Sequence, residues 1–248
     1  MDEEINNKIL NLWEKYAKKG QKGTEHYPLF YPKLRKNCEL LFVGVNPSFN
    51  EKIMSKKDHS FENKNFDFEK EIDDEGNRKL PNNKKSYKIY FKPIWEMTNK
   101  KNIREEYIEH TSWEHIDLFF CRITSQKEFK EIIDYKQQNK KVFMNEFGES
   151  QLNLSLEIIN NIKPKIIVVA NALASEVLQS RIDIDKSGFK QKGYDIAILN
   201  ENKIPIFFSS MFSGQRALDR GSIRRLKWQI ENAIKDTLKK DVDDVVAR

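Results

Sequence analysis

The stretch Gly44-Val45-Asn46-Pro47-Ser48 places one amide side chain in a stiff turn at the end of an apolar run. Glycine permits a tight turn and lets a ligand approach the backbone closely. Pro47 fixes its own φ and favours an extended conformation at Asn46. A polar turn at the carboxyl end of a parallel strand is where open α/β sheets bind their ligands. The sequence therefore predicts that Asn46 points into a binding site. The alternative is that Asn46 and Pro47 serve only to form the turn.

A second polar segment, from Ser209 to Gly221, follows the last apolar run of the chain. It consists of small and basic residues, and a basic helix is predicted from Ser222 onward. Between Gly214 and Lys240 there are eight Lys/Arg and three Asp/Glu, an excess of five positive charges. Such an excess favours contact with a polyanion, whereas a solvated helix face is the alternative.

Four apolar runs predict the strands that must position these two segments. They cover residues 39–45, 115–123, 165–170 and 204–209, and helical periodicity is found at 5–18, 149–161, 172–179 and from Ser222. Strands that alternate with helices predict an α/β fold with a central four-stranded parallel sheet in a three-layer α/β/α architecture. Because the carboxyl ends of parallel strands meet at one edge, the two polar segments are expected to lie at the same edge.

Residues 51–86 have a different character from the rest of the chain. They are rich in charged residues, hold few aliphatic ones and show no clear period. This composition predicts a long mobile insertion, either a lid beside the turn at Asn46 or a solvated excursion without a role. No Gly/Ser/Pro-rich linker divides the chain, so we expect a single domain over residues 1–248.

Composition excludes several classes of site. The two cysteines, Cys38 and Cys121, are too few for a Cys₄ zinc site, a four-cysteine iron–sulfur cluster or a disulfide framework. The four histidines show no paired ligand spacing, so neither a metal nor another cofactor is expected. The lack of a disulfide framework favours a reducing cytoplasm. No secretory signal or membrane-spanning run is seen, so no membrane binding is expected, and we expect a monomer. A net charge of +6 suits a polyanionic partner.

The segment Gly44–Ser48 resembles the first catalytic motif of the uracil-DNA glycosylase superfamily. The nearest forms are the Gly-x-Asn-Pro motifs of its thymine/mismatch-specific and single-strand-selective branches. Residues 209–216 resemble the second motif, which in that superfamily becomes a loop that pushes into the duplex. Residues 166–178 resemble a strand of that family and the helix after it. The resemblance covers about residues 38–50 and 112–240.

The resemblance implies a monofunctional DNA glycosylase that hydrolyses the N-glycosidic bond of a flipped-out uracil or a modified or mismatched pyrimidine. Its role would be base-excision repair or defence against phage DNA that carries modified bases. Asn46 would orient the attacking water, and backbone N–H groups near Ser48 would stabilise the leaving base. Residues implied to contact the base are Gly44, Val45, Phe49, Phe120 and Asn171, although a helix cap is the favoured role of Asn171. Residues implied to contact DNA are Ser210, Ser213, Gln215, Arg216, Leu218, Arg220, Arg224 and Arg225, with Arg216 and Leu218 as the wedge.

One feature departs from the family pattern. Many members place an Asn at the end of the second strand, whereas this chain reads Phe120-Cys121-Arg122-Ile123-Thr124. The base is then either not plain uracil or is read through backbone groups. Two other classes stay open. A nucleoside- or nucleotide-processing α/β enzyme would not bind a DNA duplex, and a non-catalytic DNA-binding relative would bind DNA without releasing a base.

Overall fold

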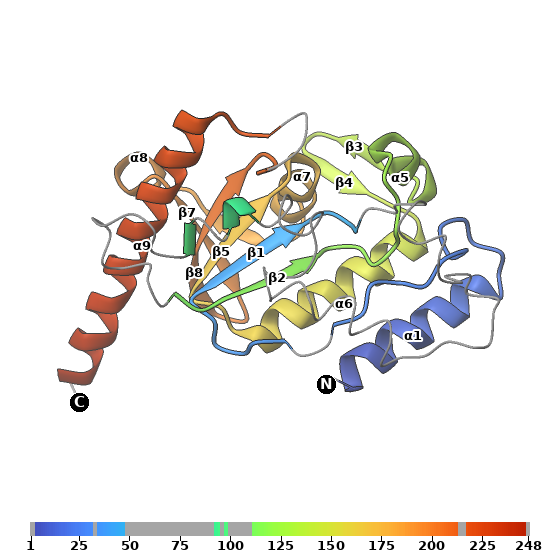
Figure 1. Cartoon of the computed structure of the whole chain (residues 1–248), viewed down its shortest axis with the longest axis horizontal. Coiled ribbons are helices and arrows are strands. Elements are labelled where there is room, and N and C mark those ends of the chain that lie inside the picture. Colours follow the sequence, from blue (N-terminus) through green and yellow to red (C-terminus); the bar gives the residue numbers. More distant parts are fainter. Residues whose placement is uncertain are drawn as a thin grey trace. The chain divides into compact units, whose positions relative to one another are not determined.

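A computed structural model describes residues 3–31, 34–47, 92–94, 97–98, 111–212 and 217–246, with side chains as far as residue 237 (Figure 1). The predicted insertion at 51–86 lies outside these residues. The chain divides into two compact units whose segments alternate along the sequence. The first unit takes Met1–Leu34, Gly44–Leu80 and Asp117–Asn161, and the second takes Arg35–Val43, Pro81–Ile116 and Ile162–Arg248.

The second unit is built on a six-stranded sheet in the order β2-β1-β5-β8-β7-β6. These strands are β2 (Trp113–Asp117), β1 (Leu40–Gly44), β5 (Ile166–Ala170), β8 (Asn202–Ser209), β7 (Asp195–Leu199) and β6 (Asp183–Asp185). β1 and β8 both pair in parallel with β5, and Figure 1 shows β2 beside β1 in the same direction. The predicted α/β fold with a mainly parallel sheet is therefore confirmed.

The sheet has two more strands than the sequence predicts. Helix α8 (Phe189–Lys192) leads into β7, which pairs antiparallel with β8 through a two-residue loop, and β6 pairs antiparallel with β7. Both loop residues, Asn200 and Glu201, have positive φ angles of 46° and 69°. Such backbone matches the twist of a tight hairpin, and Asn tolerates it better than most residues. Without a glycine, the loop lacks the usual sequence signal, so the four predicted strands account only for the parallel part.

Pro205 lies inside β8 rather than at its start or at the sheet edge. In this half of the strand, β8 pairs with β7, where Pro205 lies opposite Ile196. The pairing with β5 begins only at Ile206. Proline lacks an N–H and is tolerated where one side of a strand makes no ladder. At Pro205, β8 therefore pairs with β7 on one side only. From Ile206 onward it pairs with β5 as well.

Helix α9 (Arg220–Val246), red in Figure 1, covers an apolar face of this sheet. Leu226, Ile230 and Ile234 recur at helical spacing and are buried. They join a core formed by alternate strand residues, among them Phe42, Val168 and Phe207. Burial of one such aliphatic side chain contributes about 1.5–3 kcal/mol. The predicted stripe is thus confirmed at these positions, but the helix begins at Arg220, two residues before the predicted start.

The first unit contains α1 (Glu3–Ala17), α5 (Gln126–Ile132), α6 (Glu146–Ile162) and a hairpin of β3 (Lys136–Gln138) and β4 (Lys141–Phe143). α1 packs on α6 through aromatic rings, with centroid distances of 5.4 Å for Trp13–Phe147 and 5.1 Å for Tyr16–Phe147. The Asn139-Lys140 loop of the hairpin has positive φ at both residues. The predicted helices at 5–18 and 149–161 are present, whereas the partly helical 127–146 segment also holds this hairpin.

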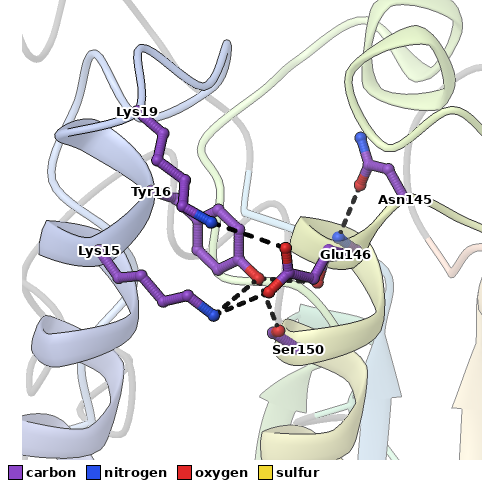
Figure 2. Close-up of polar contacts among 7 residues, drawn as sticks. Lys15, Tyr16, Lys19, Asn145, Glu146 and Ser150 are labelled. Carbon is purple, nitrogen blue, oxygen red and sulfur yellow. Dashed lines mark hydrogen bonds and ion pairs between the residues drawn. The ribbon is translucent and has the colours of Figure 1, made fainter.

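A polar cluster reinforces the contact between α1 and α6 (Figure 2). The Tyr16 hydroxyl lies 2.9 Å from Ser150 Oγ and donates to the Glu146 carbonyl oxygen at 3.2 Å. The Glu146 carboxylate accepts from Lys15 Nζ at 2.8 Å, and Lys19 Nζ lies 3.7 Å from it. These lysines hold the pKa of Glu146 below its ordinary value, chiefly through the Lys15 hydrogen bond. The pairs are exposed, so they add little stability, whereas the Tyr16 ring is buried.

We expect Tyr16→Phe to lower the free energy of unfolding by about 1 kcal/mol, because it removes the hydroxyl's hydrogen bonds to Glu146, Ser150 and Lys15 without opening a cavity. Urea unfolding at neutral pH measures the change. Lys19→Met is the matched control, since it removes an exposed ion pair and a cation–π contact with the Tyr16 ring but leaves the Tyr16 hydroxyl in place. A Tyr16→Phe protein as stable as the wild type would show that the hydroxyl contributes nothing.

Candidate functional site

The side chain of Asn46 is anchored by three backbone carbonyl groups. Its Nδ2 donates to the carbonyl oxygen of Ile123 at 2.7 Å, of Cys121 at 3.2 Å and of Pro47 at 3.1 Å. Carbonyl oxygens only accept hydrogen bonds, so the group that faces them must be the NH₂ end of the amide. The rotamer of Asn46 is therefore fixed by chemistry as well as by geometry.

This anchoring leaves the other end of the amide available. Asn46 is half-buried, and its Oδ1 accepts no hydrogen bond from the part of the chain that the structure describes. An amide oxygen is a good acceptor and a very weak base. It can orient a water molecule or a ligand N–H, but it cannot remove a proton.

The carbonyl groups that hold Asn46 belong to a segment that the sequence assigns to the second strand. β2 ends at Asp117, and residues 118–123 follow as an irregular segment. Side chains of α6 pair with two of its backbone groups. Gln151 Oε1 accepts from the Phe120 N–H at 2.8 Å, and Ser155 Oγ donates to the Leu118 carbonyl at 2.8 Å. The predicted strand 115–123 is thus wrong beyond Asp117.

The same irregular segment is tied to the turn at Asn46 through the backbone. The Phe119 N–H donates to the Val45 carbonyl at 2.9 Å, and the Ile123 N–H donates to the Pro47 carbonyl at 3.1 Å. Two chain segments 75 residues apart therefore form one rigid polar frame around a single amide. Burial raises the pKa of the Cys121 thiol in this frame, so it is not a nucleophile at neutral pH.

The other residues predicted around this turn are placed as follows. Gly44 and Val45 are buried, and Ser48 and Phe49 lie outside the described residues. Phe120 is fully buried and lies edge-on to Tyr31, with 6.5 Å between ring centroids. The Phe120 ring is thus part of the buried core, and stacking on a base stays a prediction for it.

Asn171 begins helix α7 (Ala172–Gln179) in the second unit. Its Oδ1 accepts from the Leu173 N–H at 2.8 Å and from the Ala174 N–H at 3.2 Å. This confirms the predicted N-cap, which satisfies two backbone donors that the helix itself leaves unpaired. Contact between Asn171 and a base stays a prediction.

A pocket of about 450 Å³ lies in the second unit beside the start of α7, the end of β8 and the first turns of α9. Its lining is rich in hydroxyl groups and includes one guanidinium. The lining residues are Ala172, Ser175, Phe208, Ser209, Ser210, Leu218, Ser222, Arg225, Leu226 and Gln229. Its serine hydroxyls and the Gln229 amide can both donate and accept hydrogen bonds, and the Arg225 guanidinium favours an anionic group such as a phosphate.

In the turn between β8 and α9, the described residues on either side of 213–216 are hydrogen-bonded to each other. The Leu218 N–H donates to the Met211 carbonyl at 2.8 Å, while Ser213, Gln215 and Arg216 lie outside the described residues. Asp219 then caps α9, because its carboxylate accepts from the Ser222 N–H at 2.9 Å and from Ser222 Oγ at 2.6 Å. Leu218 packs partly against the core.

The predicted DNA contacts on α9 are exposed cations. Arg220, Arg224 and Arg225 are exposed, and none of them forms an ion pair with any residue that the structure describes. Ser210 and Leu218 line the pocket together with Arg225. The sequence prediction missed Ser175, Ser222 and Gln229, whereas Ser209 begins the predicted second motif. The helical spacing of Ser222, Arg225 and Gln229 was the available signal for the α9 side.

No known family model matches the chain, and a search of curated proteins finds no match either. Within the described segments, no helix combines the length and apolar character needed to cross a bilayer. Among the same residues, no group of three or more His, Cys, Asp or Glu side chains is placed to hold a metal ion.

Proposed function

We propose that the protein is a monofunctional DNA glycosylase that releases uracil or a modified or mismatched pyrimidine from DNA. The single observation that carries this proposal is the anchored amide of Asn46, whose NH₂ end is held by carbonyl groups while Oδ1 accepts no hydrogen bond from the described residues. A cytoplasmic monomer with a three-layer α/β/α arrangement is part of the proposal, and its biological role would be base-excision repair or defence against phage DNA.

The proposed chemistry needs positioning more than it needs a strong base. The target base leaves the stack, because its glycosidic bond is not reachable inside a duplex. Asn46 Oδ1 accepts a hydrogen bond from the water whose oxygen bonds to C1′ as the C1′–N bond breaks. The base leaves as an anion, and backbone N–H groups at Val45, Asn46 and Ser48 are the proposed donors that stabilise it. The proton released by the water passes to solvent.

The target base would be read by backbone groups rather than by a second Asn side chain. In the segment Phe120–Thr124, where many glycosylases of the superfamily carry an Asn, the Cys121 and Ile123 carbonyl groups accept hydrogen bonds from Asn46 Nδ2. Carbonyl acceptors and N–H donors can still read the polar edge of a base. Modified pyrimidines are therefore included among the substrates to be tested.

The test is an assay for abasic sites. The protein is incubated with synthetic duplexes and single strands that contain uracil, mispaired thymine or modified pyrimidines, and with genomic and phage DNAs. Strand cleavage after alkali treatment scores base release. We expect release from at least one substrate by the wild type. If no DNA in the panel acquires abasic sites, the glycosylase proposal is lost.

The hydroxyl-lined pocket favours a second candidate, a nucleoside- or nucleotide-processing enzyme. Its volume of about 450 Å³ falls in the range that small-molecule sites occupy. This candidate requires binding of free nucleotides and no affinity for a DNA duplex. A non-catalytic DNA-binding protein would instead bind the duplex and leave every base in place.

Two arginine variants test whether Arg216 fills the stack that a flipped base vacates or only contacts a phosphate. We expect Arg216→Ala to slow excision from duplex DNA by roughly tenfold or more and to spare single-stranded DNA, since only a duplex has a vacated stack to fill. Arg224→Ala should weaken binding of both forms and lower the slope of log affinity against log salt by about one unit. Equal loss on both DNA forms after Arg216→Ala would make Arg216 a phosphate contact.

A further inference from the structure

The exposed face at the start of α9 combines cations with an aromatic ring. Trp228 is 62% exposed. Among the large apolar side chains of the described residues, this is the highest exposed fraction. It lies three and four residues after Arg225 and Arg224, a spacing that places all three on neighbouring positions of one helical face. A single exposed apolar side chain is common on protein surfaces, so Trp228 points to a partner only through the cations beside it.

The charge around Trp228 selects the class of partner. From Arg220 to Ile230 the helix carries four basic residues and no acidic one. Arg220, Arg224 and Arg225 have no ion-pair partner within the described chain. Unpaired guanidinium groups beside an exposed ring match a polyanion that carries flat aromatic groups, which is the chemistry of a nucleic acid.

The same helix links this face to the pocket. Ser222, Arg225 and Gln229 line the pocket, and Arg225 also borders the Arg224–Trp228 face. A strand whose phosphate reaches Arg225 would thus run directly past the indole ring. The rise from Arg224 to Trp228 is about 6 Å along the helix. The side chains of Arg224 and Arg225 are long enough to span this distance.

We propose that the first three turns of α9 bind an unpaired stretch of nucleic acid, with a base stacked on Trp228 and the flanking phosphates held by Arg224 and Arg225. In a duplex the faces of the bases are covered by their neighbours, so only an unpaired base can stack on the indole. This inference rests on the proposed function for its choice of nucleic acid as the partner, and it adds a preference for single-stranded regions.

The test uses the full-length protein and a twelve-nucleotide oligothymidylate, which contains no uracil or mismatch. Binding is measured by fluorescence anisotropy of the labelled oligonucleotide at low salt, beside a duplex of the same length. Stacking of one base contributes about 1.4 kcal/mol or more, which is tenfold in affinity. We therefore expect Trp228→Leu to weaken single-strand binding about tenfold and duplex binding less than twofold.

Two further variants control the interpretation. Trp228→Phe retains a ring and should retain most of the single-strand affinity, whereas Arg224→Ala should weaken both DNA forms. Because Trp228 is exposed, a thermal melt should be unchanged in every Trp228 variant. Trp228 fluorescence, isolated as the difference between wild type and Trp228→Phe, should be quenched by the oligonucleotide.

Several results would overturn the inference. Equal loss of single-strand and duplex affinity in Trp228→Leu would rule out stacking, as would no loss at all. Binding of polyglutamate that depends on Trp228 and outcompetes the oligonucleotide would assign the face to an acidic protein. A dimer in sedimentation that Trp228→Leu dissociates would assign it to a second copy of the chain. Because these experiments measure binding and stability, not base release, their outcomes are independent of the glycosylase assay.

Discussion

Replacing Asn46 by alanine is expected to lower the single-turnover rate of base release by roughly 10²-fold, with little change in DNA affinity. The substitution removes the Oδ1 that would position the attacking water, and a lost group of this kind costs a rate factor of this order. Quenched-flow single-turnover measurements at saturating protein give the rate, and anisotropy gives the affinity. A near-normal rate for Asn46→Ala would remove Asn46 from the chemistry.

The same variant also loses an anchor, so stability must be measured beside activity. The carbonyl groups of Cys121 and Ile123 each lose an Nδ2 donor in Asn46→Ala. Loss of a partner by a buried polar group costs about 1–3 kcal/mol. Rates should therefore be compared at a temperature well below the melting transition of both proteins.

Asn46→Asp tests the geometry without any assumption about function. It replaces the NH₂ group with an oxygen that would face the Cys121 and Ile123 carbonyl groups, and an ionised carboxylate is repelled there. We expect this variant to be less stable at neutral pH than Asn46→Ala. An Asn46→Asp protein as stable as the wild type would show that these carbonyl groups do not hold the side chain.

Asn6→Ala is expected to lower the free energy of unfolding by about 3 kcal/mol, the largest stability effect that we predict. Asn6 is fully buried on α1, where its Nδ2 donates to the Tyr31 carbonyl at 2.6 Å and its Oδ1 accepts from the Tyr31 N–H at 2.9 Å. Alanine leaves both backbone groups of Tyr31 without these partners in a buried place. Each such loss costs about 1–3 kcal/mol.

The next residue supplies a matched control. Asn7 is exposed on the same helix, so Asn7→Ala makes the same chemical change without removing a buried hydrogen bond. Alanine has the higher helix propensity, and stability should stay constant or rise slightly. Urea unfolding at neutral pH compares the two variants. If Asn6→Ala and Asn7→Ala differ by less than about 0.5 kcal/mol, the paired bonds to Tyr31 contribute little.

The sequence by itself determined the elements whose signals are local. The apolar runs of β1 and β5 predict buried parallel strands because every residue in them is aliphatic, aromatic or glycine. The spacing of Leu226, Ile230 and Ile234 predicts the buried stripe of α9, since helical period alone brings them to one face. Asn171 is predictable as a cap because capping involves only the next three residues.

Only the tertiary structure decided where the second strand ends. The run from His115 to Ile123 is apolar enough to continue as a strand, but its backbone partners after Asp117 include Gln151 and Ser155 of a later helix. A side chain more than 30 residues away leaves no local pattern in the strand itself. The hairpin loop at Asn200-Glu201 also could not be predicted from the sequence. Its two residues adopt positive φ although neither is a glycine.

The candidate site likewise has some features that the sequence shows and others that depend on the folded structure. The type and turn chemistry of Asn46 are visible in the sequence, because Gly44 and Pro47 act on their immediate neighbours. Which end of its amide is held, and which end is available, depends on carbonyl groups 75 and 77 residues later. Hydrogen bonds of that range form only after the chain has folded. The Pro47 carbonyl is the one local acceptor among the three, and the other two come from the tertiary structure.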